Sequence, residues 1–368
     1  MGRTVQKVGA MVAMTCLFVN RCSAMHYSLR ASLFQIFRMN FYFLMDKLND
    51  IQPTEVNDQH PCVVFAQGLQ GLGVPYHGNM PFLKDFNKET FLIDISDEIN
   101  SNTIVVTNQP QKYMNELQQY KRQGHKIIVM DTCDEWCRNV HERALPFTDY
   151  YYRSSYHTSN RLPNVFPFAF SLSNRIIQTT SFVDMKKWSE RTPVIFQAHR
   201  VDHSLRNHVK NYYNSGRCPI AVEYYNDKFE APKEGTEEHF HWCQTGRRHS
   251  VKYYEKLASV QMIDAHGGHF TPQKLLQIDS WKLWEGFAAG CLVITLDFKY
   301  YGIQLPFELI GYKHYIPIRY DKLDESYQML NRLTTEQRAR IASSGREYVL
   351  SNYSPEGIAK YICSKLNA

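Results

Sequence analysis

Short apolar runs alternate with helix-forming segments over most of this chain, and that alternation is the feature that most restricts its fold. Four such runs lie in the first half, at residues 62–66, 91–95, 103–107 and 126–131. Each is short and rich in β-branched side chains, which is typical of strands buried on both faces of a parallel sheet. A helix is expected between the last two runs, over residues 110–123 with Asn108 as its cap. The pattern predicts βαβ units.

The same alternation starts again after a polar hinge at residues 186–191. The strands expected in this second half lie at residues 193–198, 219–223, 259–263, 292–296 and 315–318. The helices expected between and after them lie at residues 203–214, 250–257 and 278–289, and from Leu323 onward. A chain of 368 residues is too long for one ordinary hydrophobic core. We therefore predict an α/β fold with two Rossmann-like domains that face a cleft, and a ligand at the carboxyl ends of the strands.

The chain is expected to divide into four parts, at residues 1–55, 56–187, 188–345 and 346–368. The two central parts are the Rossmann-like domains. The last part is a helix that packs back on the first domain.

The first part, residues 1–55, is apolar and amphipathic and allows three interpretations. Residues 8–19 have the layout of a secretion signal and are too few to span a bilayer. Residues 29–48 have an amphipathic pattern, which fits an interfacial helix or a helix packed on the first domain. The third interpretation is that the native protein starts at Met39. Residues 8–48 are thus a candidate for peripheral membrane contact, and the compartment, cytoplasmic or secretory, stays open.

Charge and cysteine content do not indicate a nucleic-acid-binding or metal-binding protein. The net charge is +6 and no run of five basic residues occurs, so nucleic acid is not an expected partner. The nine cysteines have neither disulfide nor zinc-knuckle spacing. His239, His241, Cys243 and His249 look like a metal cluster, but no established zinc-binding frame supports it. No cofactor and no essential metal are expected.

The segment from Asp279 to Ile294 gives the strongest indication of a ligand site. Ser280 is placed as the cap or an early residue of a helix, whose free N–H groups and dipole favour an anion. Lys282 adds a cation in the same turn. Glu285 follows one turn later, where its carboxylate can accept two hydrogen bonds from vicinal hydroxyls such as those of a ribose. Taken singly, each residue is better explained by an ordinary amphipathic helix, and only the whole string favours a site.

Residues 250–320 resemble the nucleotide-sugar domain of exostosin-like glycosyltransferases and, more loosely, that of other two-Rossmann-domain (GT-B) transferases. Those families have a Ser, a basic residue and a Glu in this helix, then Ala-Gly-Cys, an apolar strand and Leu-Pro-Phe. The matching residues are Ser280, Lys282, Glu285, Ala289-Gly290-Cys291 and Leu305-Pro306-Phe307. The resemblance implies that Glu285 binds the donor ribose and that Ser280 and Lys282 lie near the diphosphate.

The donor loop before this helix departs from the family pattern, which often has Arg-Gly. Here the loop reads Asp264-Ala265-His266-Gly267-Gly268-His269, and the sugar therefore stays open. His266 and Gly267 are assigned to the donor site because paired glycines allow close backbone approach to a phosphate or sugar. Arg200 lies at a strand end where GT-B enzymes commonly place a basic residue, and its proposed role is to offset charge on the leaving diphosphate. A surface or interdomain salt bridge is the alternative for Arg200.

His77 and Asp131 are the two candidates for a general base. The glycines at positions 68, 71 and 73 lack dinucleotide-binding spacing, so this region is expected to be an acceptor-side loop with His77 at the cleft. A neutral imidazole can take a proton from an acceptor hydroxyl near pH 7. Asp131 ends the run at residues 126–131 and is the second candidate. His77 is preferred, and a structural or exposed role is the alternative for both.

These features together predict a glycosyltransferase that moves a sugar from a nucleoside diphosphate, with UDP preferred, to a hydroxyl of a glycan or glycoconjugate. The resemblance to exostosin-like enzymes, which in general invert the anomeric centre, implies inversion. Residues 56–187 would form the acceptor side and residues 188–345 the donor domain. The alternatives are a nucleotide-sugar epimerase or hydrolase on the same fold, and a non-catalytic glycan- or nucleotide-binding protein. The sequence does not determine the sugar, the acceptor or the oligomeric state.

Overall fold

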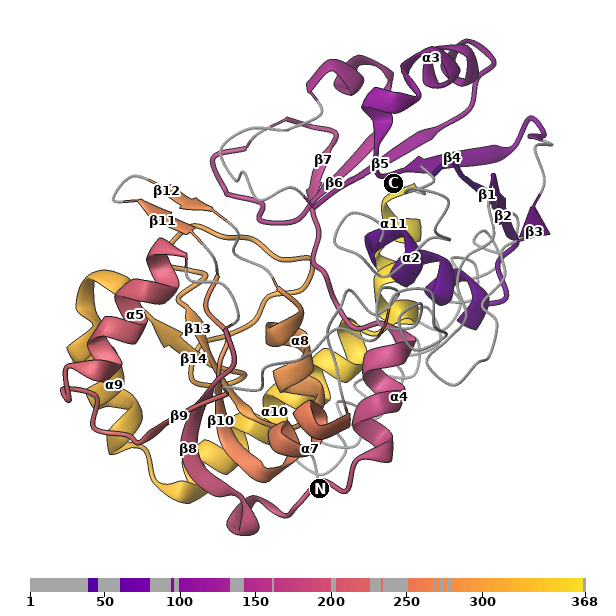
Figure 1. Cartoon of the computed structure of the whole chain (residues 1–368). Helices are drawn as coiled ribbons and strands as arrows, with labels where there is room; N and C mark the ends of the chain where they lie inside the picture. The colour runs from indigo at the N-terminus through magenta and orange to yellow at the C-terminus, as the bar shows by residue number, and fades with distance from the viewer. Residues whose placement is uncertain are drawn as a thin grey trace, which may run out of the picture.

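The computed structural model describes residues 39–45, 60–79, 94–95, 99–132, 142–160, 162–199, 203–225, 233, 251–267, 269–271, 274–276 and 280–366. Predicted features that lie outside these residues include the signal-like stretch at 8–19, Arg200, and the histidine–cysteine group at 239–249. The described residues form two large parallel sheets with their helices, one above the other in Figure 1. None of the helices in this described part is long and apolar enough to cross a membrane.

The first sheet has seven strands in the spatial order β3-β2-β1-β4-β5-β6-β7, and all neighbours are parallel. The strands are β1 (Asn40–Phe43), β2 (Tyr76–Gly78), β3 (Asp94–Ile95), β4 (Thr103–Thr107), β5 (Ile127–Asp131), β6 (Tyr150–Arg153) and β7 (Val165–Pro167). This is the Rossmann order 3-2-1-4-5-6 with one more strand. β4 and β5 confirm two of the predicted strands, and only the last two residues of the run at 91–95 are described.

Residues 40–43, for which an interfacial or a packed helix was among the open interpretations, form a central strand of this sheet. β1 pairs with β2 on one side and with β4 on the other. Phe41 and Phe43 pack against Phe65, whereas Tyr42 belongs to the apolar cluster on the opposite face. Side chains of a strand alternate in this way. The helix interpretations were wrong here because both faces of the run are buried, so no polar residue reveals the period of two.

The run at residues 62–66 is part of a helix and not the predicted first strand. It belongs to α2 (His60–Gly71), which connects β1 to β2, and its residues from His60 to Leu69 are all buried. A helix without a polar face cannot be told from a buried strand by periodicity. Gly68 and Gly71 therefore lie in a helix, and the predicted acceptor-side loop does not form there.

The last helix, α11 (Pro355–Leu366), packs along α2 (Figure 1). Gly68 allows this close approach, because a Cβ atom there would overlap the carbonyl oxygen of Pro355 and lie 2.7 Å from Cβ of Ala359. The helix also reaches the first sheet, where the hydroxyl of Tyr152 donates to the carbonyl of Ile362 at 3.3 Å. The end of the chain thus covers the domain that its beginning forms.

The second sheet has five parallel strands in the spatial order β14-β13-β10-β8-β9. The strands are β8 (Thr192–Gln197), β9 (Val222–Tyr224), β10 (Val260–Asp264), β13 (Leu292–Leu296) and β14 (Ile316–Ile318). Counted from β8, the order is 2-1-3-4-5, which is the second common doubly wound arrangement. β11 (His269–Thr271) and β12 (Lys274–Leu276) form a separate antiparallel hairpin. The predicted α/β fold with two Rossmann-like sheets is confirmed.

The other described helices are α3 (Met114–Arg122), α4 (Asn174–Phe182), α5 (Ser204–Asn214), α7 (Val251–Ser259), α8 (Trp281–Ala288), α9 (Leu323–Arg332) and α10 (Thr335–Asn352). Among them, α3, α5, α7 and α8 connect strands of one sheet, α4 stands between the two sheets in the chain, and α9 and α10 follow the last strand. Four short 3-10 helices are η1 (Pro110–Lys112), η2 (Glu142–Phe147), η3 (Trp188–Glu190) and η4 (Tyr320–Lys322). The helix predicted from residue 110 begins as η1, and α3 has Tyr113 as its N-cap in place of Asn108.

Two loops join the domains at the carboxyl ends of their strands. The loop after β6 meets the loop after β13: the N–H of Thr158 donates to the carbonyl of Gly302 at 2.8 Å, and the N–H of Gln304 donates to the carbonyl of Tyr156 at 2.9 Å. Gly302 has φ +65°, and a side chain there would come within 2.8 Å of the His157 ring. One apolar core also runs through both domains. The carboxyl edges of the two sheets are therefore held together at this junction.

Candidate functional site

Three ionisable side chains gather at the switch point of the second sheet, between β8 and β10. Ligands of such sheets bind beyond the carboxyl ends of the strands at this place. His199 follows β8, Asp264 is the last residue of β10, and His266 comes two residues later. Their side chains are 0–1% exposed.

Asp264 is the centre of this group, which we call the Asp264 cluster. Its Oδ1 lies 3.3 Å from Nε2 of His199 and 3.1 Å from Nε2 of His266, and it accepts the backbone N–H of His266 at 3.2 Å. Its Oδ2 accepts the hydroxyl of Tyr213 at 3.2 Å, and that hydroxyl lies 2.5 Å from the hydroxyl of Tyr327. The His199 contact is not aligned as a hydrogen bond, and Nδ1 of His199 is buried without a partner. A buried polar atom left without a partner is a mark of a missing water or ligand.

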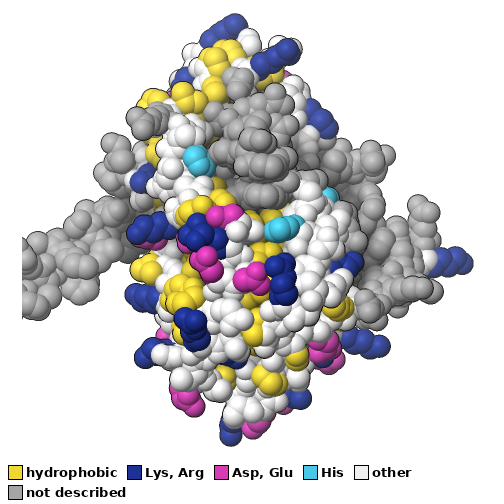
Figure 2. Space-filling model, turned by 90° about the vertical axis from the view of Figure 1, so that its left-hand side faces the viewer, with side chains coloured by type: hydrophobic (Ala, Val, Ile, Leu, Met, Phe, Trp, Pro, Cys, Tyr) yellow, Lys and Arg dark blue, Asp and Glu magenta, His cyan; other side chains and the backbone are white. Residues whose placement is uncertain are grey.

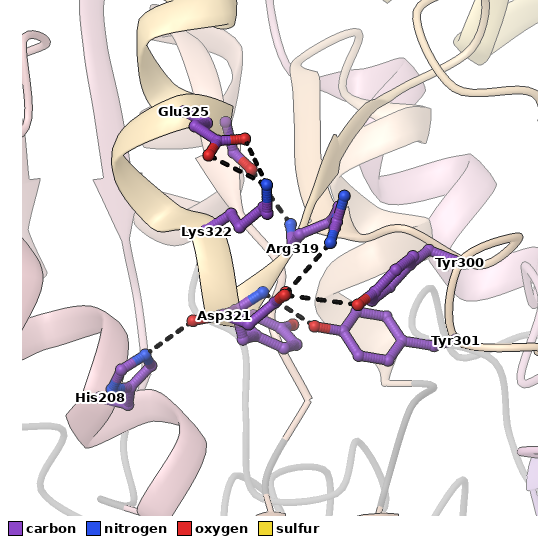
Figure 3. Close-up of polar contacts among 9 residues, drawn as sticks. His208, Tyr300, Tyr301, Arg319, Asp321, Lys322 and Glu325 are labelled. Carbon is purple, nitrogen blue, oxygen red and sulfur yellow. Dashed lines mark hydrogen bonds and ion pairs between the residues drawn. The ribbon is translucent and has the colours of Figure 1, made fainter. Parts of the chain in front are cut away.

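Tyr320, next to the end of β14, holds His266 in this position. Its hydroxyl lies 3.0 Å from Nδ1 of His266. The backbone of Tyr320 is itself fixed, since its N–H donates to the hydroxyl of Tyr301 at 2.8 Å and its carbonyl lies 3.0 Å from Nε2 of His208 (Figure 3). The segments after β13 and β14, together with α5, thus support the cluster.

The surface beside Tyr320 carries charges of both signs. Nη2 of Arg319 lies 3.2 Å from Oδ2 of Asp321, and its guanidinium lies over the Tyr300 ring at 3.9 Å (Figure 3). Lys322 pairs with Glu325 at 3.1 Å. Figure 2, which faces the side of α5 and α9, shows Lys and Arg side chains mixed with Asp and Glu near its centre. That face therefore presents no field of a single sign.

Burial and nearby charges set the protonation of the cluster. Burial lowers the pKa of His199 to about 4, against the opposing effect of Asp264 and with a further lowering by Lys282 and Arg206. Burial also lowers the pKa of His266. For Asp264, burial by itself raises the pKa, but His266 and His199 outweigh it and the pKa falls to about 2. Near pH 7 the cluster is therefore one carboxylate between two neutral imidazoles.

The neighbour of His199 decides which ring nitrogen carries its proton. Asp264 lies beside Nε2 and favours the proton on that nitrogen. Nδ1 then keeps its lone pair. It can accept a hydrogen bond from a ligand hydroxyl without any charge being buried.

Ser280 and Lys282 lie where the sequence placed them, at the start of α8. Ser280 is the N-cap and its side chain makes no capping hydrogen bond. Trp281 packs edge-on against His60 and Phe170 of the first domain, with ring centroids 5.4 Å and 5.7 Å apart. Lys282 is close enough to His199 to lower its pKa. The start of α8 and the Asp264 cluster therefore form one polar region.

The other end of α8 is closed by arginines. Nη1 of Arg191 donates to the carbonyls of Ala289 and Gly290, both at 3.0 Å, and Nε of Arg346 donates to the carbonyl of Ala288 at 3.0 Å. Gly290 has φ +70°, the left-handed conformation that ends many helices. This termination fixes the direction of α8, and with it the place of Ser280 and Lys282.

Glu285 is buried, and tyrosines of α7 bind its carboxylate. The hydroxyl of Tyr253 donates to Oε2 at 3.1 Å and that of Tyr254 to Oε1 at 3.3 Å. Nη1 of Arg175, from α4, donates to the hydroxyl of Tyr254 at 3.0 Å. Both carboxylate oxygens thus accept protein hydroxyls in this structure, and a ribose would have to replace them.

The two predicted bases lie in the first sheet. Asp131, at the end of β5, is fully buried; its Oδ2 accepts Nη1 of Arg153 at 2.7 Å and also the hydroxyl of Tyr151. His77 is half-buried within β2, where its ring lies 5.3 Å from that of Tyr42. His77 is therefore a strand residue and does not follow the strand's carboxyl end. Neither residue belongs to the Asp264 cluster.

Sequence reasoning did not recognise His199 and Asp264 as partners. The sequence pattern indicates Arg200 and not its neighbour His199, and it gives Asp264 no role, whereas it places His266 and the buried Gly267 in the site. Both missed residues stand directly after, or at the end of, an apolar run. Position at the carboxyl ends of two strands was the signal that could have found them.

No protein-family model matches the chain, and no curated protein matches it. Solved structures with a similar fold include HepE from Anabaena in complex with UDP-glucose, which is 10% identical over 89% of this chain and 99% of its own, with a TM-score of 0.49. An α,α-trehalose-phosphate synthase (UDP-forming) from Burkholderia vietnamiensis is 8% identical over 89% and 99%, with a TM-score of 0.47. MurG from Acinetobacter baumannii is 8% identical over 89% and 100%, with a TM-score of 0.41. These similarities concern the backbone fold.

Proposed function

We propose that this protein is a glycosyltransferase that takes a sugar from a UDP-sugar and transfers it to a hydroxyl of a glycan or glycoconjugate. The observation that carries the proposal is the polar region at the switch point of the second sheet. It combines the start of α8 and Lys282 with the Asp264 cluster. The exostosin-like pattern of α8 supports a nucleotide-sugar as the ligand.

The start of α8 suits the donor diphosphate. The first N–H groups of a helix and its dipole attract an anion, and Lys282 adds a half-buried cation in the first turn. The hydroxyl of Ser280 makes no capping bond and can donate to a phosphate oxygen. Arg200 is proposed to offset the charge that grows on the departing UDP.

The histidines of the cluster suit sugar hydroxyls. Nδ1 of His199 is the acceptor that lacks a partner, and we assign to it a hydroxyl of the donor. His266 and Gly267 form the adjoining backbone, where a glycine allows a sugar or phosphate to come close. Glu285 is proposed as the ribose ligand, with the ribose hydroxyls replacing those of Tyr253 and Tyr254.

Transfer with inversion needs one base and a stabilised leaving group. The acceptor hydroxyl attacks the anomeric carbon, the bond to the diphosphate breaks, and the base takes the hydroxyl proton. The ion pair of Asp131 with Arg153 supports a structural role for Asp131. His77 is the base we propose. No metal is proposed as essential, so a chelator should leave transfer unchanged.

Titration with UDP, followed by a UDP-sugar screen with mass detection of glycan products, tests the proposal. We expect UDP to bind, transfer to require an acceptor, and Lys282→Gln to weaken UDP binding by about tenfold or more, because a charge-assisted hydrogen bond contributes about 1.5–3 kcal/mol. The matched control is Lys322→Gln, which removes an exposed lysine of the same domain that pairs with Glu325. Donor consumption without acceptor would instead indicate an epimerase or hydrolase. UDP binding without any product would indicate a binding protein, and no UDP binding contradicts the donor site.

Membrane contact by the N-terminal segment is a separate proposal. It concerns residues 8–38, because residues 40–43 lie inside the first sheet. Flotation with anionic vesicles, comparing the full chain with one lacking residues 1–38, tests it, and equal flotation of both contradicts it.

A further inference from the structure

Arg153, the last residue of β6, is a fully buried arginine, and two of its three guanidinium nitrogens have no hydrogen-bond partner. Its side chain is 1% exposed, and Nη1 donates to Oδ2 of Asp131 at 2.7 Å. Nε and Nη2 are both buried without a hydrogen-bond partner. Nε of Arg319 and of Arg338 is also unpaired, but those two residues are partly exposed. Arg153 is thus a fully buried cation that has donors without a partner on two of its nitrogens.

The two unused nitrogens form one edge of the guanidinium plane. Nε–H and Nη2–H on that edge point in parallel, which is the geometry that binds two oxygens of one carboxylate or phosphate group. Leaving buried donors of a charged group without a partner is unfavourable, and native structures rarely do so without a reason. The free edge is therefore shaped for a planar or tetrahedral oxyanion.

Asp131 and Tyr151 prepare the arginine for such a ligand. Asp131 holds the guanidinium through Nη1 alone, so the pairing fixes the orientation of the plane and leaves the opposite edge open. The hydroxyl of Tyr151 donates to the same Oδ2 and draws off part of the carboxylate charge. This weakens the repulsion between Asp131 and a second anion on the far side of Arg153.

The position of Arg153 links this edge to the substrate region. It stands at the carboxyl end of its strand, the edge of a Rossmann-like sheet at which ligands bind. Ser155 follows with a left-handed backbone, φ 54°, and the chain then makes the contact with the second domain through Tyr156 and Thr158. Arg153 thus lies in the domain proposed for the acceptor, three residues from the junction with the donor domain.

We propose that Arg153 binds a carboxylate or phosphate group of the acceptor, so that the enzyme acts on an acidic glycan or glycoconjugate. This inference rests on the proposed function. Both nitrogens are closed off from solvent in the present structure. Binding therefore includes a local opening, and the oxyanion takes the edge of the guanidinium that is now unpaired.

Arg153→Lys is the discriminating variant, because lysine keeps the charge beside Asp131 and loses the two-pronged edge. The acceptor probes are a glucuronate-terminated disaccharide, its methyl ester, and a 6-phosphorylated disaccharide. We expect the wild type to prefer an acid over the ester, and the variant to lose about tenfold to a hundredfold in kcat/KM for the acid while its rate on the ester is unchanged. A preference for the uronate or for the phosphate identifies the group. A wild type that treats acid and ester alike, or a variant that keeps the preference, overturns the proposal.

Two further measurements keep this test separate from the glycosyltransferase proposal. UDP binding by Arg153→Lys should equal that of the wild type, since Arg153 lies in the other domain. Binding of free glucuronate and of inorganic phosphate, followed by NMR titration, needs no turnover and tests the arginine even if no transfer is found. Should Arg153→Lys not fold, the double variant Asp131→Asn, Arg153→Gln removes both charges. It should bind neither probe, and binding at the wild-type level contradicts the assignment.

Discussion

Tyrosine hydroxyls act as the hydrogen-bond donors for two buried carboxylates of the second domain. Asp264 accepts from Tyr213, and Glu285 accepts from Tyr253 and Tyr254. Burial, with the nearby carboxylate adding to it, raises the pKa of Tyr213 and of Tyr253 well above its usual value, so these hydroxyls keep their protons. A buried carboxylate without such donors would be strongly unfavourable.

The role of Glu285 can be separated from that of its tyrosines. If Glu285 binds ribose, Glu285→Gln should weaken UDP binding by about tenfold or more, since a charge-assisted hydrogen bond contributes about 1.5–3 kcal/mol. The control is the double variant Tyr253→Phe, Tyr254→Phe, which removes the competing donors; it should lower the melting temperature and leave UDP binding equal or tighter. Calorimetry with UDP measures both. Normal UDP binding by Glu285→Gln, together with a lower melting temperature, would show that Glu285 only anchors α7 to α8.

The Asp264 cluster should make stability fall on mild acidification. The pKa of His199 is lowered from 6.5 to about 4, so the unfolded chain binds its proton first as the pH falls. Stability from this group is complete above pH 6.5 and is lost between pH 6.5 and 4; His266 acts in the same direction. We expect a loss on the order of 2 kcal/mol between pH 7.5 and pH 5 from His199. The lowered pKa of Asp264 adds a separate loss only below pH 3.8.

Urea unfolding at pH 7.5 and at pH 5 measures this loss, and His199→Gln is the matched variant. The variant should lose less stability than the wild type over the same interval. Equal pH dependence of the two proteins would mean that His199 is not held neutral in the fold.

At the scale of elements, the sequence revealed those whose pattern is local. β4, β5, β8, β10 and β13 are short β-branched runs with turn residues around them, and each lies within one residue of its predicted range. α8 was recognised because its cap and its terminating glycine stand next to it in the chain. The predictions for β1 and α2 were wrong because both elements are buried on all sides by segments far away in the chain. Their sequences therefore lack the alternation of apolar and polar residues that distinguishes a strand from a helix.

The candidate site divides in the same way. Ser280, Lys282 and Glu285 belong to one continuous string and could be found from it. The side-chain contacts within the Asp264 cluster could not, because its members come from β10, α5, α9 and the segment after β8 and meet only through the strand order. The hydrogen-bond partners of Asp131 and Glu285 could not be predicted for the same reason. They come from other segments of the chain, and the sequence around a residue does not identify them.

The packing of α11 on α2 can be tested with two glycines of one helix. Gly68→Ala places a Cβ against the Pro355 carbonyl, a backbone atom that cannot move aside, and should destabilise by about 1–3 kcal/mol. Gly71→Ala meets the side chain of Glu356, which can swing away, and should be neutral or stabilising by up to about 1 kcal/mol through helix propensity. Chemical unfolding of both variants gives the comparison. Equal effects would show that α2 and α11 are less closely packed.

At the scale of the whole molecule, the two domains should unfold as one. A single apolar core contains residues of both sheets, and α11 ties the end of the chain to the first domain. In a Trp136→Phe background all remaining tryptophans lie within residues 188–345, so their fluorescence reports on the second domain, whereas circular dichroism reports on both. Coincident transitions by the two probes are the sign of one cooperative unit.

Ile362→Ala, in α11, should therefore shift both transitions together. Ile362 is fully buried, and its truncation should cost about 2–5 kcal/mol. Lys360→Ala, on the exposed side of the same helix, is the control and should change little. A variant in which circular dichroism shifts while tryptophan fluorescence stays at the wild-type midpoint would show two independent units.

Because α11 packs on α2, the order in which the domains are synthesised differs from the order in which they are completed. A ribosome releases all seven strands of the first sheet long before residue 366, and domains of most proteins fold as they emerge. Here the outer face of α2 stays uncovered until the last helix has left the ribosome, whereas the second domain has all its strands and α10 before that point. The domain that is translated first is therefore the one that is completed last, and a newly made chain shows α2 to any chaperone that binds apolar helices.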